Sequence, residues 1–128
     1  MACAVALLVT GACRQVRNQA MLPDGYLDTP ANGAQISEIT PVMGWALSED
    51  GIESVSIYLD RRYVMEAKTG LSRPDVGQLH PQIPDAARSG WEADLKLDGV
   101  AGGVHTIAAL IRSKANATAC VSTKVTVR

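Results

Sequence analysis

The 128-residue sequence contains no phenylalanine and few other aromatic residues, only 2 Trp and 3 Tyr. Its interior must therefore be built from Val, Ile, Leu and Ala around two or three large side chains. It also lacks an excess of charge of one sign, because it has 12 Lys and Arg and 13 Asp and Glu, which gives a net charge of −1. A nucleic-acid-binding domain needs a basic excess on one face. We therefore expect no nucleic acid among its partners.

No hydrophobic run is long enough to cross a membrane as a helix, which takes about 20 residues. The first twelve residues, MACAVALLVTGA, are uncharged and are typical of the apolar region of a secretory signal. Gly11 and Ala12 directly before Cys13 resemble the processing site of bacterial lipoproteins. In that family the cysteine thiol accepts a diacylglycerol. The sequence thus predicts a signal or lipoprotein-like segment and short tether at residues 1–24, with a lipid anchor to the membrane at Cys13.

One feature of this first segment leaves an alternative open. Lipoprotein signals usually carry Lys or Arg before the apolar run, and the first two residues here are Met and Ala. The alternative places residues 5–9 in an edge strand or a short helix of the fold. The cysteines are Cys3, Cys13 and Cys120. If the first two belong to a processed segment, Cys120 is a lone thiol and the domain has no internal disulfide.

From residue 25 onward apolar and polar residues alternate with a period of two, which is typical of half-buried β-strands. The clearest case is WEADLKL at residues 91–97, in which four apolar side chains alternate with three charged ones. Turn dipeptides such as Asn32-Gly33 and Asp98-Gly99 separate the runs. Strands are predicted at residues 25–29, 41–47, 52–60, 62–68, 91–97, 104–112 and 121–128. Seven strands at this spacing predict an all-β fold, a Greek-key β-sandwich.

Short motifs stand at the strand starts and in the loops. They are LDTPANG at 27–33, GWAL at 44–47, DGI at 50–52 before VSIYLD at 55–60, RPDV at 73–76, PQIP at 81–84, SGW at 89–91 and GVHTI at 103–107. Together they resemble the bacterial immunoglobulin-like domains of secreted and cell-surface proteins. The resemblance implies a seven-stranded immunoglobulin-like Greek-key β-sandwich over residues 25–128, located in the bacterial cell envelope, either membrane-anchored or secreted. It also implies an interaction, adhesion or spacer module that is not an enzyme and has no cofactor or metal.

The connection between residues 70 and 90 is too long for a simple turn, and loops of this length are often functional or tied to the fold. It contains Arg73, Asp75 and His80. One hypothesis makes it a surface on which Arg73 and Asp75 bind a sugar or a peptide. The other has them form a salt bridge that pins the loop to the sandwich. His80 with Asp75 and Asp85 has the residue types of a metal or acid–base cluster, but the spacing matches no known ligand pattern.

Trp45 is in phase with Met43 and Leu47, while the residues between them occupy the opposite strand face. Either face can be the inner one. Large aromatic residues usually supply core area, which favours a buried Trp45. The alternative is an exposed Trp45 beside Tyr58 or Tyr63, which would form a platform for sugar stacking.

Three function classes follow from these patterns. The first is a non-enzymatic envelope module whose partner is an unknown protein or glycan at the cell surface. The second is a carbohydrate-binding module that uses the 70–90 loop and an exposed aromatic residue. The third is a small hydrolase or metal-dependent enzyme, which requires His80 to meet carboxylates in a pocket. The candidate binding residues are Trp45, Arg73, Asp75 and His80. His105, in phase with Ile107, is predicted to be a satisfied core or boundary histidine instead of a ligand.

Overall fold

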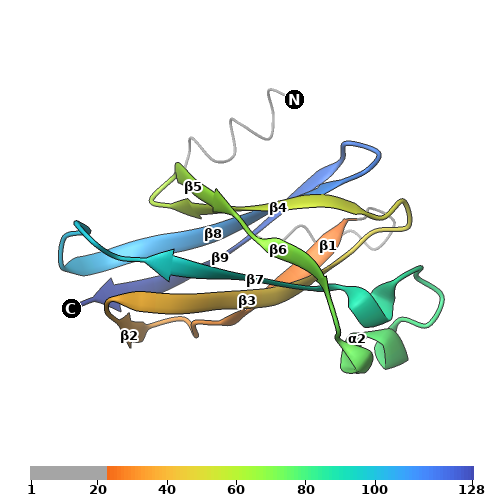
Figure 1. Cartoon of the computed structure of the whole chain (residues 1–128), viewed down its shortest axis with the longest axis horizontal. Helices are drawn as coiled ribbons and strands as arrows, with labels where there is room; N and C mark the ends of the chain where they lie inside the picture. Colours follow the sequence, from red (N-terminus) through yellow and green to blue (C-terminus); the bar gives the residue numbers. More distant parts are fainter. Residues whose placement is uncertain (1–22) are drawn as a thin grey trace.

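Two β-sheets packed face to face make up the described part of the chain, as Figure 1 shows. The computed structural model describes residues 23–128. The predicted lipidation at Cys13, and nearly all of the predicted segment at 1–24, lie outside the described residues. Within residues 23–128 no helix is long and apolar enough to span a bilayer. The all-β sandwich predicted from the alternating pattern is confirmed.

The first sheet has four strands and the second has five. In spatial order the first sheet contains β1 (Asp24–Thr29), β3 (Ile39–Leu47), β7 (Gly90–Lys96) and β6 (Lys68–Leu71). The second contains β2 (Ala34–Ile36), β9 (Thr118–Val127), β8 (Gly103–Ser113), β4 (Ile52–Leu59) and β5 (Arg62–Glu66). Neighbours are antiparallel except β2 and β9, which are parallel.

The described residues form nine strands instead of the seven predicted. The strand β2 is only three residues long, too short for a period-two pattern to mark it. The strand predicted at 62–68 is two strands, because the chain changes sheets at Ala67. There β5 leaves β4, Ala67 donates its N–H to the Val55 carbonyl at 2.8 Å, and β6 then pairs with β7.

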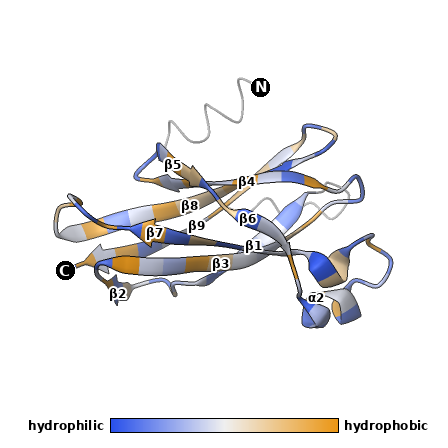
Figure 2. Ribbon diagram, in the orientation of Figure 1, coloured by the Kyte–Doolittle hydropathy of each residue, from blue (hydrophilic) through white to orange (hydrophobic). Residues whose placement is uncertain are grey.

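The core lies between the sheets and is built by the alternation seen in the sequence (Figure 2). Trp91 and Leu95 on β7 are 1% and 0% exposed, and Val55 and Ile57 on β4 are both fully buried. The inward face predicted for residues 91–97 is confirmed. The other fully or nearly fully buried apolar members are Val42, Ile107, Ala109, Ile111 and Val125.

The segment predicted as a long irregular loop contains regular structure. It begins with the end of β6, continues into the short helix α2 (Pro74–Leu79), and reaches the 3-10 turn η1 (Ala86–Arg88) before β7. Val76 and Ala86 are buried in a second small core with Leu47, outside the space between the sheets. A six-residue helix with one buried side chain leaves no helical periodicity for sequence reasoning to find. In Figure 1 the two helical turns lie together at one end of the sandwich.

Cys120 is 7% exposed and is disulfide-bonded. The lone thiol expected at Cys120 is that of a processed chain without Cys3 and with Cys13 lipidated, and it stays a prediction. Those two cysteines lie outside the described residues.

Candidate functional site: the outer face of the first sheet

The outward face of β3 is apolar along its whole length. It consists of Ile39, Pro41, Met43 and Trp45, which we call the β3 outer row. Ile39 and Met43 are 56% and 39% exposed. The outer face of an antiparallel sheet is normally polar where it meets water. This row is therefore a feature that the fold alone does not require.

Charged side chains flank the β3 outer row on β7. The strand register sets Ile39 opposite Lys96, Pro41 opposite Asp94 and Met43 opposite Glu92. All three charged residues are exposed. Residues opposite each other on antiparallel strands share a sheet face and lie close together. The surface is thus an apolar strip with hydrogen-bonding groups along one side.

The β3 outer row ends in an aromatic stack. Tyr26 on β1 lies opposite Trp45, with ring centroids 6.4 Å apart and an interplanar angle of 24°. Tyr26 is 49% exposed, whereas Trp45 is half-buried. The Trp45 ring also lies near the His80 ring, with centroids 6.1 Å apart and an interplanar angle of 40°, and packs against the small core of Leu47, Val76 and Ala86.

This position corrects both interpretations of Trp45. It is not in the core between the sheets, because the inward face of β3 is occupied by Val42, Gly44 and Ala46. It also does not lie beside Tyr58 or Tyr63, which contact each other on the second sheet at 5.9 Å. Trp45 is half-covered by the 74–88 segment instead.

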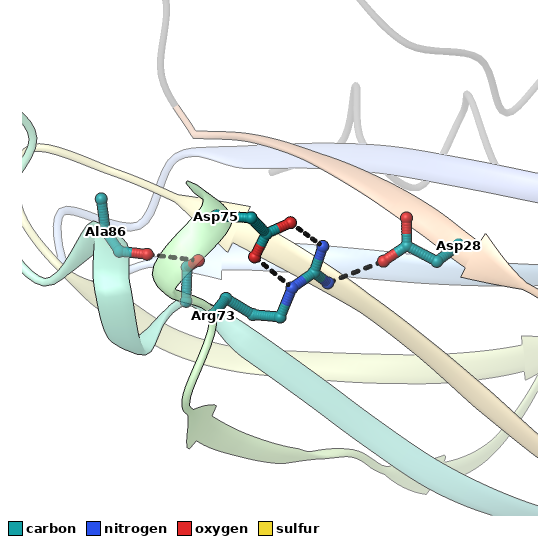
Figure 3. Close-up of polar contacts among 5 residues, drawn as sticks. Asp28, Arg73, Asp75 and Ala86 are labelled. Carbon is teal, nitrogen blue, oxygen red and sulfur yellow. Dashed lines mark hydrogen bonds and ion pairs between the residues drawn. The ribbon is translucent and has the colours of Figure 1, made fainter. Parts of the chain in front are cut away.

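Arg73 ties that segment to the first sheet, as Figure 3 shows. Its Nε and Nη2 donate to the two oxygens of Asp75, at 3.0 and 2.8 Å, and Nη1 donates to Asp28 Oδ2 at 2.7 Å. Asp28 lies on β1, so this is the pinning salt bridge hypothesised from the sequence. The hydrogen bonds that Arg73 donates lower the pKa of Asp75 to about 2, and the same bonds, accepted by the Asp75 carboxylate, raise the pKa of Arg73.

The structure brings the candidate residues together in two pairs, Trp45 with His80 and Arg73 with Asp75. Within residues 23–128 no group of three or more His, Cys, Asp or Glu side chains is placed to hold a metal ion. Sequence reasoning missed Tyr26 and Met43. The available indication was that residues 41–47 are apolar at every position, which is typical of a strand that is apolar on both faces.

His105 forms a separate polar site at the far end of β8 from the β8–β9 turn. Its Nδ1 bonds the Asp60 carboxylate, and its Nε2 bonds the Ala101 carbonyl at 2.7 Å. Both partners are acceptors, so both ring nitrogens are satisfied only in the protonated imidazolium. The bond to Asp60 raises the pKa of His105. Burial raises the pKa of Asp60, but hydrogen bonds from the Thr106 N–H and His105 outweigh it and lower that pKa.

We expect stability to depend on pH through this pair. Because the pKa of His105 is higher in the folded chain, protonated His105 contributes its full share of the unfolding free energy below the pKa of the unfolded chain, about 6.5. That share is lost as pH rises through the pKa of the folded chain. The lowered pKa of Asp60 adds stability above about pH 4, which is lost on acidification. His105→Gln should therefore lower the unfolding free energy by about 1 kcal/mol near pH 5.5 and by less at pH 8.5. Urea titrations of both proteins at both pH values measure this loss of unfolding free energy. An equal loss at pH 5.5 and pH 8.5 would contradict a stabilising bond between protonated His105 and Asp60.

Residues 23–109 match the family described as the bacterial Ig domain. The chain belongs to that family. No curated protein matches the sequence.

Two solved structures show the same fold as this bacterial Ig domain. One is the endo-beta-1,4-mannanase from Thermotoga petrophila, with a TM-score of 0.61 and 14% identity over 84% of this chain and 20% of that one. The other is the fibronectin(III)-like modules of Clostridium thermocellum CbhA, with a TM-score of 0.58 and 15% identity over 80% of this chain and 93% of that one. The Ig domain thus spans about a fifth of the mannanase chain. At these identities the similarity concerns the fold alone.

Proposed function

We propose that this bacterial Ig domain is a non-catalytic binding module of the cell envelope and that the β3 outer row is its contact surface. The observation that carries the proposal is the exposed apolar strip from Ile39 to Trp45, bordered by the charges of β7. Apolar patches with polar rims are typical of protein interaction surfaces. The first candidate partner is therefore another protein at the cell surface.

We place the module at the envelope through a lipid on Cys13. A diacylglycerol joined to the Cys13 sulfur as a thioether would hold the module at the membrane.

The contact surface is tested by placing a charge in the middle of the β3 outer row. In a Cys13→Ser background, which removes the lipid, the protein is mixed with purified envelopes and the pelleted fraction is measured. We expect Met43→Asp to reduce binding about tenfold, since it buries a charge in an apolar contact. The matched control is Val104→Asp, at a residue 70% exposed on the second sheet, which should bind normally. Equal binding by both variants would rule out the β3 outer row as the contact surface.

A glycan is the second candidate partner, and the Tyr26–Trp45 stack favours it. The exposed Tyr26 ring, stacked on Trp45, offers a face for a sugar ring, and Asp28 and Arg73 offer polar groups for hydroxyls. The similar fold in a mannanase chain suggests the probe. Soluble glucomannan added to the same pelleting assay would displace a glycan-binding module, and Tyr26→Ala would abolish binding. If glucomannan has no effect on binding, the protein partner is retained.

A further inference from the structure

A cavity of about 350 Å³ opens at the end of the sandwich near η1, away from the β3 outer row. It lies where β3 ends, β4 and β7 begin, and the β8–β9 turn approaches. Its apolar wall is formed by Ala46, Ile52, Val55 and Trp91. Binding pockets for small molecules begin at about this size, about 300 Å³, and combine an apolar wall with a few polar groups.

Two cationic side chains, Arg88 and Lys114, also line this cavity. Neither forms an ion pair within the described residues. Lys114 lies beside the β3–β4 turn. Its backbone N–H donates to the Gly51 carbonyl at 3.0 Å, and its side chain passes close to Gly51. Asp85 is the carboxylate among the lining residues, so the two cations leave the lining with a net positive charge.

The walls of the cavity are held in place by local hydrogen bonds. Ser89 donates its hydroxyl to the Ala86 carbonyl at 2.7 Å, which fixes η1 against the start of β7. Ser48 accepts the Asp50 N–H at 3.1 Å and shapes the β3–β4 turn on the other side. Arg88 is thus carried by an ordered turn, and Lys114 lies beside the ordered β3–β4 turn through its contact with Gly51.

We propose that this cavity binds a small organic anion, a carboxylate on an apolar body. The carboxylate would lie between Arg88 and Lys114, which offer charge-assisted hydrogen bonds, and the body would contact Ile52 and Pro84 on the cavity wall. This inference is independent of the proposed function, since none of the residues that line the cavity belongs to the β3 outer row.

The test is an NMR titration of the ¹⁵N-labelled full-length chain with 4-methylbenzoate, taken to about 10 mM to reach weak affinities. The neutral isostere 4-methylbenzyl alcohol is titrated in parallel. The two tryptophans separate the two sites, because Trp91 lines the cavity and Trp45 belongs to the β3 outer row. We expect shifts at the Trp91 indole and at the Gly51 and Gly70 amides, with the Trp45 indole unmoved.

Charge variants complete the test. Arg88→Gln and Lys114→Gln should each weaken benzoate binding about fivefold, whereas Lys124→Gln, on the second sheet, should leave it unchanged. The amide spectrum of each variant shows directly that it is folded. The proposal is overturned if the alcohol binds as tightly as the benzoate, if Lys124→Gln has the same effect, or if no cavity resonance moves. Movement of the Trp45 indole alone would overturn it too, while leaving the proposed contact surface intact.

Discussion

Replacing Trp91 with Ala should lower the unfolding free energy by about 3–5 kcal/mol. Trp91 is 1% exposed at the centre of the core, so the variant loses apolar burial and leaves a large void. The indole N–H has no hydrogen-bond partner within the described residues, so no hydrogen bond is lost with it. Urea-induced unfolding followed by circular dichroism measures the change.

Leu79→Ala is the control for Trp91→Ala. Leu79 is 76% exposed, and a substitution there should change the unfolding free energy by less than about 0.5 kcal/mol. A loss below about 1 kcal/mol for Trp91→Ala would show that the inward face of β7 has been assigned wrongly.

The second large effect is expected from adding a single methyl group at Gly44. On β3 a Cβ at this position would overlap the Tyr26 carbonyl oxygen and lie 2.6 Å from Cζ2 of Trp91. Neither neighbour is the flexible end of a side chain, so β1 or the Trp91 ring must move. We expect Gly44→Ala to cost about 3 kcal/mol, at the upper end of the usual range for overpacking.

Gly102→Ala is the matched control for Gly44→Ala. A Cβ on Gly102 would lie 3.4 Å from the Val127 carbonyl, an ordinary contact at an exposed position. Thermal melts should show a Tm lowered by roughly 10 °C or more for Gly44→Ala and nearly unchanged for Gly102→Ala. Equal Tm values would mean that β1 and β3 do not approach each other as described.

The main strands could be predicted because alternation in the sequence directly reflects burial on one sheet face. Residues 91–97 illustrate this, since their apolar members all face the core. The phase of β3 could not be predicted in the same way. Both of its faces are apolar between residues 41 and 47, so periodicity does not show which one faces inward. The position of Trp45 follows instead from the contacts of β3 with β1 and with the 74–88 segment.

The candidate site was predicted in part. Loop length and residue type identified Arg73 and Asp75, and the salt bridge follows from their chemistry. The third member, Asp28, is 45 residues away in sequence, and the pair of His105 with Asp60 has the same separation. Such partners are brought together by the order of strands within each sheet and by the packing of loops on them, which a single sequence does not reveal. The sheet change at Ala67 is hidden for the same reason.

The central claim is that a lipid on Cys13 anchors this module in the cell envelope. Its most direct test is the intact mass of the protein made by its native cells, measured after the membrane and soluble fractions are separated. We predict a membrane-bound chain that begins at Cys13 and carries the added mass of a diacylglycerol. A soluble chain that still begins at Met1 and carries no lipid would contradict this prediction.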